Sequence, residues 1–462
     1  MEKNTFNRNS LVKLEIIDLT NTGEGIGKIE GFAVFVDGTV PGDMVKARLV
    51  IVKKNYAVGV VEKFYQLSEY RVDPPCQYFG ECGGCQIQNI RYDRQLEIKR
   101  NIVVSALERI GGIEDAGELT QKTIGMENPY KYRNKAQYKL SPGGKIGFYR
   151  KKSHHVIPLQ KCIIQIDPGE KLISGIERGI KDYKISIFDE NTGAGFLKGI
   201  VHRVSQLTGE MMLILVVNKE NVKGKNNVHK LPGFDSFVKK IIDENPEIKS
   251  LYINFNKGKN NRVMGFENEL VYGKERIIDS IGEVEFSISP LSFFQINNKM
   301  TDAIYKTAKN FLDLTGSETV FDLYCGIGTI GLYLADKAKK VYGIEILSAA
   351  IEDAQNNARL NNIDNAEFMV GKSEEKILDL MDKGIKADSV VLDPPRKGCD
   401  QSLLETLIEA NPERIVYVSC NPATLARDIK ILSDSYKVQK IQPIDNFSHS
   451  MHVETVTLLV RK

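Results

Sequence analysis

The residue with the clearest chemical potential is Cys420, in the segment Val416-Tyr-Val-Ser-Cys-Asn-Pro-Ala-Thr424. The apolar, β-rich run before it predicts a strand and the Asn-Pro after it favours a turn, so the thiol is expected at the carboxyl end of a strand. In an open α/β sheet this edge is where ligands bind and chemistry takes place. The alternative is a small apolar core residue, the commoner role of a free cysteine. The rest of the chain favours the chemical role.

A glycine motif supplies a candidate cofactor site. Gly326-x-Gly328-x-x-Gly331 follows a β-rich run and precedes an apolar helical pattern. This is the dinucleotide fingerprint, and Glu345 lies near the offset expected for an acid that binds ribose, so a nicotinamide enzyme is one interpretation. Asp322 before the glycines and Asp393-Pro-Pro at a later strand end favour S-adenosylmethionine (SAM) instead. The amino acid part of SAM carries an ammonium group, and SAM has no pyrophosphate.

Cysteines are concentrated in Cys76-x5-Cys82-Gly-Gly-Cys85. The total of seven is odd and low for the length of the chain, which argues against a disulfide scaffold and for metal-binding or catalytic roles. A fourth ligand is needed, and Cys162 is the candidate by elimination, because each remaining cysteine lies inside another motif. Thiolates bind zinc and iron-sulfur clusters, and the spacing does not decide between them.

A long basic stretch predicts a polyanionic partner. Residues 128–166 contain no Asp or Glu but hold nine Lys or Arg, interleaved with Tyr130, Tyr132, Tyr138, Phe148 and Tyr149. Cations that alternate with aromatic rings suit phosphate contacts and base stacking. A solvated basic face is the alternative interpretation, and the length of the run favours RNA.

The chain is too long for one core, so several domains are expected. Short β segments with glycine turns in 1–66 predict a small barrel of the oligonucleotide-binding type. Mixed strands and helices in 67–290 predict an α+β central domain, in which 92–110 is an amphipathic helix ended by Gly111-Gly112. Strand, glycine turn and helix alternate in 291–462, which is typical of a doubly wound α/β sheet.

Several classes are disfavoured. No apolar run is long enough to span a membrane, and the N-terminal residues lack the apolar segment of a signal peptide, so a cytoplasmic protein without a membrane partner is expected. The net charge of +3 is uninformative. No feature calls for an obligate protein partner.

Taken together, these motifs resemble the bacterial RNA uracil-5-methyltransferases, in the branch that carries an N-terminal TRAM domain and an iron-sulfur cluster and acts on 23S ribosomal RNA. The resemblance spans essentially the whole chain. Its most specific segments are the cysteine motif with Cys162, Ser292-Phe-Phe-Gln295-Ile-Asn297, Asp322-Leu-Tyr324-Cys-Gly-Ile-Gly, Asp393-Pro-Pro-Arg-Lys-Gly398, Ser419-Cys420-Asn-Pro-Ala-Thr424 and His452-Val-Glu454-Thr.

The resemblance implies a role for each of these residues. Cys420 would be the nucleophile and Glu454 the base. The SAM contacts would be Gln295, Tyr324, Glu345 and Asp393, and a 4Fe-4S cluster would be held by Cys76, Cys82, Cys85 and Cys162. The family also builds its catalytic domain from the C-terminal part and the early segment 93–124. Alternatives are the same chemistry on transfer RNA, a noncatalytic RNA-binding assembly factor and, least favoured, an NAD-dependent oxidoreductase.

Overall fold

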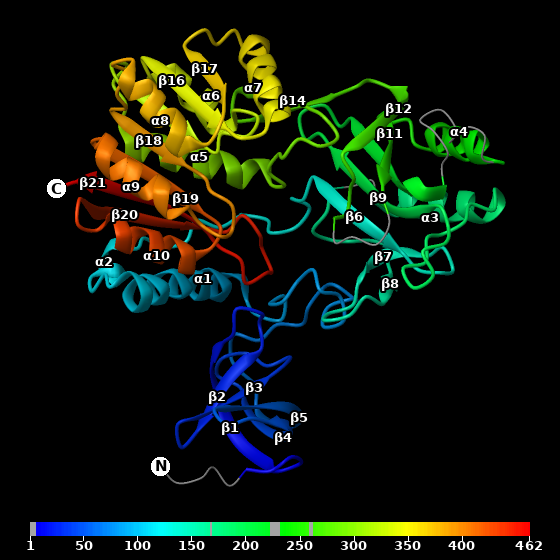
Figure 1. The fold of residues 1–462 in the computed structure, drawn as a ribbon. Coiled ribbons are helices and arrows are strands. Elements are labelled where there is room, and N and C mark those ends of the chain that lie inside the picture. Colours follow the sequence, from blue (N-terminus) through cyan, green and yellow to red (C-terminus); the bar gives the residue numbers. More distant parts are fainter. Residues whose placement is uncertain (1–5, 167–168, 222–231, 258–261) are drawn as a thin grey trace.

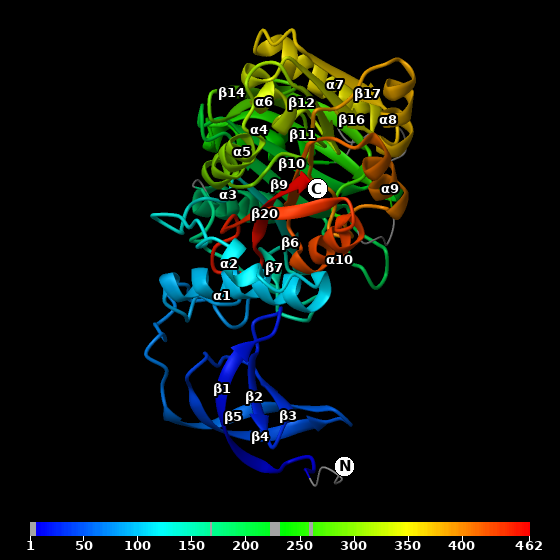
Figure 2. The ribbon, with the colours of Figure 1, turned by 90° about the vertical axis from the view of Figure 1, so that its left-hand side faces the viewer.

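The computed structural model describes residues 6–166, 169–221, 232–257 and 262–462 (Figure 1). The N-terminal part is a closed barrel with strand order β1-β2-β3-β5-β4. Its strands are β1 Leu11–Leu19, β2 Gly25–Ile29, β3 Phe32–Val36, β4 Met44–Val52 and β5 Tyr56–Gln66. Val12, Leu14 and Ile16 are buried while their neighbours in β1 are exposed, so one face of each strand fills the barrel. The barrel lies at one end of the molecule in both views (Figures 1 and 2).

A seven-stranded central sheet has the order β12-β11-β10-β9-β6-β7-β8. Its elements are β6 Lys135–Leu140, β7 Ile146–Tyr149, β8 Val156–Pro158, β9 Leu197–Val204, β10 Met211–Asn218, β11 Ile248–Asn256 and β12 Glu267–Gly273, with helices α3 Gly169–Asp182 and α4 Phe234–Glu244. Every residue of β10 is buried. Leu213 and Leu215 pack in the core that includes α4, whereas Met212 and Ile214 pack in the core of the C-terminal half. The continuous apolar run of β10 therefore reflects a sheet covered on both faces.

The C-terminal half contains a second seven-stranded sheet, in the order β17-β16-β15-β18-β19-β21-β20. Its strands are β15 Thr319–Leu323, β16 Lys340–Glu345, β17 Ala366–Val370, β18 Ser389–Leu392, β19 Arg414–Ser419, β20 Tyr436–Ile444 and β21 Glu454–Arg461. The first five in space are parallel, and β21 runs antiparallel to β19 and β20. The chain leaves β15 toward β16 and later returns to β18 on the other side of β15. This is the switch point at which doubly wound sheets bind ligands.

Helices cover both faces of this sheet. The core on one face includes residues of α5 Asn298–Leu312, α6 Thr329–Leu334 and α7 Ser348–Leu360, together with the hairpin β13 Ile277–Ile281 and β14 Val284–Ile288. The core on the other face includes residues of α8 Ser373–Asp382, α9 Gln401–Ala410 and α10 Pro422–Leu432. The predicted fold class is confirmed, and the proposed boundaries at residues 66 and 290 stay a prediction.

The early helix α1 Tyr92–Ala106 packs beside α10 and β20 and lies between the C-terminal half and the barrel (Figures 1 and 2). It continues as a π-helical turn over Leu107–Gly111 and ends at Gly112, whose φ of 70° requires a left-handed backbone. Val103 and Leu107 are buried, but Ile110 is 41% exposed, which departs from the predicted apolar face. The wider π turn shifts the phase of the last side chains.

A fully buried ion pair joins α1 to the segment that precedes β21. Lys99 Nζ bonds a carboxylate oxygen of Asp445, and both side chains have no exposed surface. Lys99 Nζ also donates to the carbonyl of Phe447 at 3.0 Å. The second oxygen of Asp445 accepts from Tyr92 Oη and Ser448 Oγ, each at 2.6 Å. Every polar group of this buried pair therefore has a partner.

Three consecutive cations of the basic stretch form ion pairs with acids from elsewhere in the chain. Arg150 pairs with Glu81, Lys151 with Asp37 and Lys152 with Glu24. Two of the interleaved rings, Tyr132 and Tyr138, are 5% and 1% exposed and belong to the interior. The expectation of base stacking is therefore wrong for these two tyrosines. Tyr138 points from β6 into the core of the central sheet, and the buried Tyr132 donates from its hydroxyl to the carbonyl of Ser448 at 3.1 Å.

Candidate active site

A cavity of about 1290 Å³ opens at the carboxyl edge of the C-terminal sheet. The residues predicted to be catalytic or to bind the cofactor all line it: Gln295, Tyr324, Glu345, Asp393, Cys420 and Glu454. Tyr324, Asp393 and Cys420 directly follow β15, β18 and β19, and Glu345 ends β16. Glu454 begins β21, and because that strand is antiparallel, its first residue lies at the same edge. The structure thus brings together residues that are more than 150 positions apart.

The glycine turn shapes one side of the cavity. Gly328 has a φ of 82°, and a Cβ there would lie 2.9 Å from the ring of Phe368, so only glycine fits. Glu345 accepts hydrogen bonds from the backbone N–H of Gly326 at 3.3 Å and of Leu347 at 3.0 Å. These bonds fix the carboxylate and leave lone pairs for further donors such as ribose hydroxyls.

Asp322 offers an unpaired buried oxygen to the same cavity. One carboxyl oxygen accepts from Gly331 N at 2.8 Å, and the other has no partner among the described residues. Burial raises the pKa of Asp322 to about 8, and the charges of Asp393 and Glu345 add to the shift. A buried carboxyl group without a donor is costly. The ammonium group of SAM would supply that donor, so the site fits this cofactor.

Cys420 is held between the end of β19 and the start of α10. Ser419 Oγ accepts from Asn421 N at 3.1 Å, and the Asn421 side chain caps α10 by accepting from Ala423 N at 3.1 Å. Pro422 occupies the first turn of the helix, where its missing N–H costs nothing. The strand end and the helix cap together fix the direction of the thiol, as the Ser-Cys-Asn-Pro motif predicts.

Burial dominates the electrostatics of the reacting groups. Burial first, and then the charges of Glu454 and Asp393, raise the pKa of Cys420 to about 11, while Arg396 opposes this shift. Burial likewise raises the pKa of Glu454 to about 8 and that of Asp393 to about 7. Glu454 is only 4% exposed. The protein alone therefore keeps the thiol protonated.

Arg396 and His452 are two residues at this site that received no role from the sequence. Arg396 Nη2 lies 3.0 Å from both ring nitrogens of His452. Burial and the neighbouring charge of Arg396 lower the pKa of His452 to about 4, so the ring is neutral near pH 7 and accepts from the guanidinium. Both residues lie within segments that carry the resemblance, and their place in these segments could have marked them as site residues.

The Ser-Phe-Phe-Gln-Ile-Asn segment forms another wall. Asn297 caps α5 by accepting from Met300 N at 3.3 Å and donates to the carbonyl of Asn446 at 3.1 Å. Gln295 and Phe293 line the cavity, and Phe293 is 72% exposed. This exposure shows that Phe293 is not a core residue.

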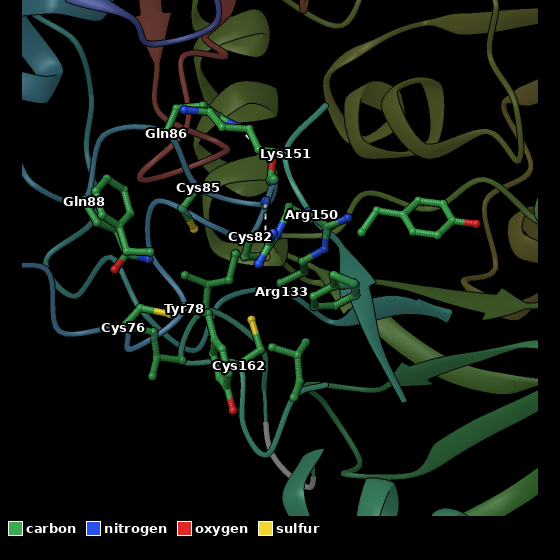
Figure 3. A pocket seen from close by; sticks show the side chains of 18 of the residues that line it. Cys76, Tyr78, Cys82, Cys85, Gln86, Gln88, Arg133, Arg150, Lys151 and Cys162 are labelled. Carbon is green, nitrogen blue, oxygen red and sulfur yellow. Dashed lines mark hydrogen bonds between the residues drawn. The ribbon is translucent and has the colours of Figure 1, made fainter. Parts of the chain in front are cut away.

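The four remaining predicted site residues gather at a second cavity, of about 760 Å³. Cys76, Cys82, Cys85 and Cys162 all line it, and Figure 3 shows their side chains around a shared space. Burial raises the pKa of Cys85 to about 12 and of Cys162 to about 11. In the part of the chain that the structure describes, no three His, Cys, Asp or Glu side chains lie close enough to hold one metal ion. Cys162 thus lines the same cavity as the three cysteines of the compact motif, and the role of the four as ligands stays a prediction.

Comparison with known proteins identifies the class of enzyme. Residues 249–462 match the family described as tRNA (uracil-5-)-methyltransferase, and residues 7–61 match the TRAM domain. An uncharacterized RNA methyltransferase of Clostridium tetani is 46% identical over 456 residues, which are 98% of this chain and 96% of the relative. One from Bacillus cereus is 42% identical over 458 residues, 98% of this chain and 97% of the relative.

A solved structure extends the likeness to the fold. The Pyrococcus abyssi tRNA (uracil-54, C5)-methyltransferase in complex with S-adenosyl-L-homocysteine has a TM-score of 0.76 and 30% identity, covering 97% of this chain and 100% of that one. The chain belongs to the tRNA (uracil-5-)-methyltransferase family. It is a SAM-dependent RNA (uracil-5-)-methyltransferase, as the resemblance predicted, and neither an oxidoreductase nor a noncatalytic assembly factor. Among the described helices, none is long and apolar enough to cross a membrane.

The buried carboxyl group of Glu454 generates a prediction about stability. Its pKa is about 8 in the folded state against an ordinary value of 4.5, so between these pH values the folded state holds a proton that the unfolded state has released. Stability must then fall as the pH rises through this window. Glu454→Gln removes this contribution, and at pH 8.5 the variant should be more stable than the wild type by up to about 5 kcal/mol.

Urea unfolding at pH 5 and pH 8.5 measures the difference, with Glu409→Gln on the exposed side of α9 as the matched control. An identical pH dependence for the wild type and both variants would contradict the assigned burial of the Glu454 charge.

Proposed function

We propose that this enzyme methylates C5 of a specific uridine in 23S rRNA through a covalent bond between Cys420 and C6 of the base. The observation that carries the proposal is the convergence of Cys420 and Glu454 on one cavity with the cofactor residues. The resemblance to the branch with the cysteine motif supports ribosomal RNA as the substrate. The four cysteines of that motif border one cavity in this protein.

The chemistry explains why a thiol and a carboxylate are both needed. C5 of uracil is a poor nucleophile at neutral pH. Cys420 gives its proton to a neighbouring carboxylate, and the sulfur attacks C6, which forms an S–C6 bond and places the electron pair of the ring on C5 as an enolate. When bound, SAM would supply an electrophilic methyl group to C5, with the S–CH3 bond broken and the thioether S-adenosylhomocysteine as the leaving group, and the positive charge of its sulfonium. Glu454 then removes the C5 proton, the S–C6 bond breaks, and Cys420 and the aromatic ring are restored.

The raised pKa values suit the buried carboxyl groups to accept and donate protons during the reaction. Near neutral pH, Asp393 and Glu454 have pKa values of about 7 and 8, so each can gain or lose a proton at little cost. Arg396 is the cation that favours the Cys420 thiolate against the surrounding burial. A positive charge entering the cavity lowers the pKa of the thiol further, so nucleophile activation is tied to occupancy of the cofactor site.

The target base has to leave its stack before the sulfur can reach the face of the ring. Extrusion costs a few kcal/mol. Phe293 is 72% exposed at the wall of the cavity and offers a stacking surface that offsets this cost. Gln295, two residues further along, lines the same cavity.

We further infer that Cys76, Cys82, Cys85 and Cys162 hold a 4Fe-4S cluster. Thiolates ligate both zinc and iron-sulfur clusters, and the resemblance to the branch with the cysteine motif supports the cluster. The cluster would cross-link the 76–85 loop to the segment around Cys162 and so shape the RNA-facing side of the central domain.

Transfer RNA is a second candidate substrate. The Pyrococcus abyssi relative is a tRNA (uracil-54, C5)-methyltransferase and shares the fold over 97% of this chain. Mass mapping of 5-methyluridine in ribosomal and transfer RNA from cells that lack the gene decides between them. Loss of 5-methyluridine from 23S rRNA alone supports the proposal, and loss confined to tRNA overturns it.

Variants of the two reacting residues should fail at different steps. Cys420→Ala should abolish both methyl transfer and covalent capture of RNA. Glu454→Gln should still capture RNA, because the thiol is intact, but should release it at least about 100-fold more slowly, since general base catalysis is lost. Denaturing gel electrophoresis with labelled RNA shows the adduct, and transfer of labelled methyl shows turnover. Normal turnover by either variant would refute its assigned role.

Metal analysis tests the cysteine centre independently of activity. Protein purified without oxygen should contain about four irons per chain and show the broad visible absorption of an iron-sulfur protein. Cys162→Ser should lower the iron content, whereas Cys399→Ser, which changes a buried cysteine of the other core, should not. Stoichiometric zinc without iron would overturn the assignment.

A further inference from the structure

An apolar patch lies on the rim of the catalytic cavity. The most exposed large apolar side chains in the described part of the chain are Phe266, Phe293, Leu347 and Ile346, at 77%, 72%, 64% and 61%. All of them line this one cavity. Scattered apolar residues on a surface are ordinary, but a gathered patch marks a binding surface.

Three of these side chains would be covered by the cofactor or by the target base. Ile346 and Leu347 follow Glu345 at the end of β16, beside the glycine turn, where the nucleoside of the cofactor would cover them. Phe293 lies two residues before Gln295 and serves the target uracil. Phe266 belongs to a different element, the loop before β12 of the central sheet, and no step of the reaction uses it.

The loop that carries Phe266 is anchored firmly at its base. Gly265 N donates to Asn254 Oδ1 at 2.7 Å, and Asn254 Nδ2 donates back to the Gly265 carbonyl at 2.9 Å. Asn254 is fully buried in β11. A Cβ at Gly265 would lie 2.0 Å from the carbonyl oxygen of Phe255, so the loop crosses β11 at a distance that only glycine allows. The backbone next to Phe266 is therefore held against β11, which lowers the entropy cost of binding at its ring.

The chemistry around the ring indicates its ligand. The guanidinium of Arg262 lies 4.5 Å from the centroid of the Phe266 ring, and Arg262 also lines the cavity. An aromatic ring with an adjacent arginine combines base stacking with attraction for phosphate. The surface is continuous with the cavity that the target base must enter. A neighbouring nucleotide of the same strand is then the group that arrives beside it.

We propose that Phe266, together with Arg262, forms a second stacking site that binds an unpaired nucleobase next to the target uridine. The site deepens the proposed function and rests on it, because it requires an RNA strand splayed into the cavity. It contributes to substrate binding rather than to the chemical step. It also makes the central domain recognise that the RNA on one side of the target is unpaired.

Kinetics of three variants on a hairpin RNA that the wild type methylates test the site. Phe266→Ala should raise KM for RNA about 5- to 100-fold, the range for losing one base–aromatic stack, with kcat within about twofold. Phe266→Trp should keep the wild-type KM. Tyr272→Ala is the matched control, since Tyr272 is a 41% exposed ring of β12 that does not line the cavity. It should leave both constants unchanged.

Fluorescence of 2-aminopurine placed beside the target uridine reports the stack directly. Binding to the wild type and to Phe266→Trp should quench the probe at one of the two flanking positions, and binding to Phe266→Ala should not. Quenching by Phe266→Ala equal to the wild type, or an equal rise in KM for Phe266→Ala and Tyr272→Ala, would overturn the stacking site. Failure of the proposed function is a separate result, in which the wild type leaves the ribosomal hairpin unmethylated. In that case, the same variants test the stacking site on the RNA that the mapping of 5-methyluridine identifies as the substrate.

Discussion

The buried ion pair between Lys99 and Asp445 is the interaction on which the arrangement of the active site depends. Leaving either charge unpaired in the interior would cost several kcal/mol, so helix α1 and the segment 445–453 have to dock together. Tyr92 and Ser448 complete the hydrogen bonding of Asp445. Because Glu454 follows this segment directly, a helix from the first quarter of the chain helps to place this residue, the proposed base.

The same segment separates the two cavities. The carbonyl of His449 accepts from the backbone N–H of Gln86 at 2.8 Å and of Ile87 at 3.1 Å, next to the last cysteine of the motif. The ring of His449 stacks on Tyr130 at 4.6 Å. His452 lines both the cysteine cavity and the catalytic cavity. The cysteine loop, the start of the basic stretch and the active site thus share one wall.

Within the catalytic cavity, burial sets the protonation states. A thiol and several carboxyl groups are enclosed together, and withdrawal from water raises the pKa of each. Such a group of acids destabilises the fold at high pH, a cost that is common at catalytic sites. It also equips the site to receive a cation and to move protons near neutral pH. Arg396, held by a neutral His452, is the cation that counters this burial at the thiol.

The sequence alone determined that the residues directly after the parallel strands lie at the active-site edge of the sheet. Cys420, Asp393 and Tyr324 each come directly after an apolar β run, and parallel strands bring their carboxyl ends to one edge, so local pattern was sufficient. The glycine spacing likewise determined the cofactor turn, since no other residue fits at Gly328.

Only the tertiary structure decided which residues from distant parts of the chain meet. Glu454 reaches the edge because β21 inserts antiparallel between β19 and β20, and Lys99 finds Asp445 across the fold. Basic residues with no acid nearby in sequence find Glu24, Asp37 and Glu81 in space. These outcomes depend on burial and on long-range pairing, which sum over the whole folded chain and leave no local pattern in the sequence.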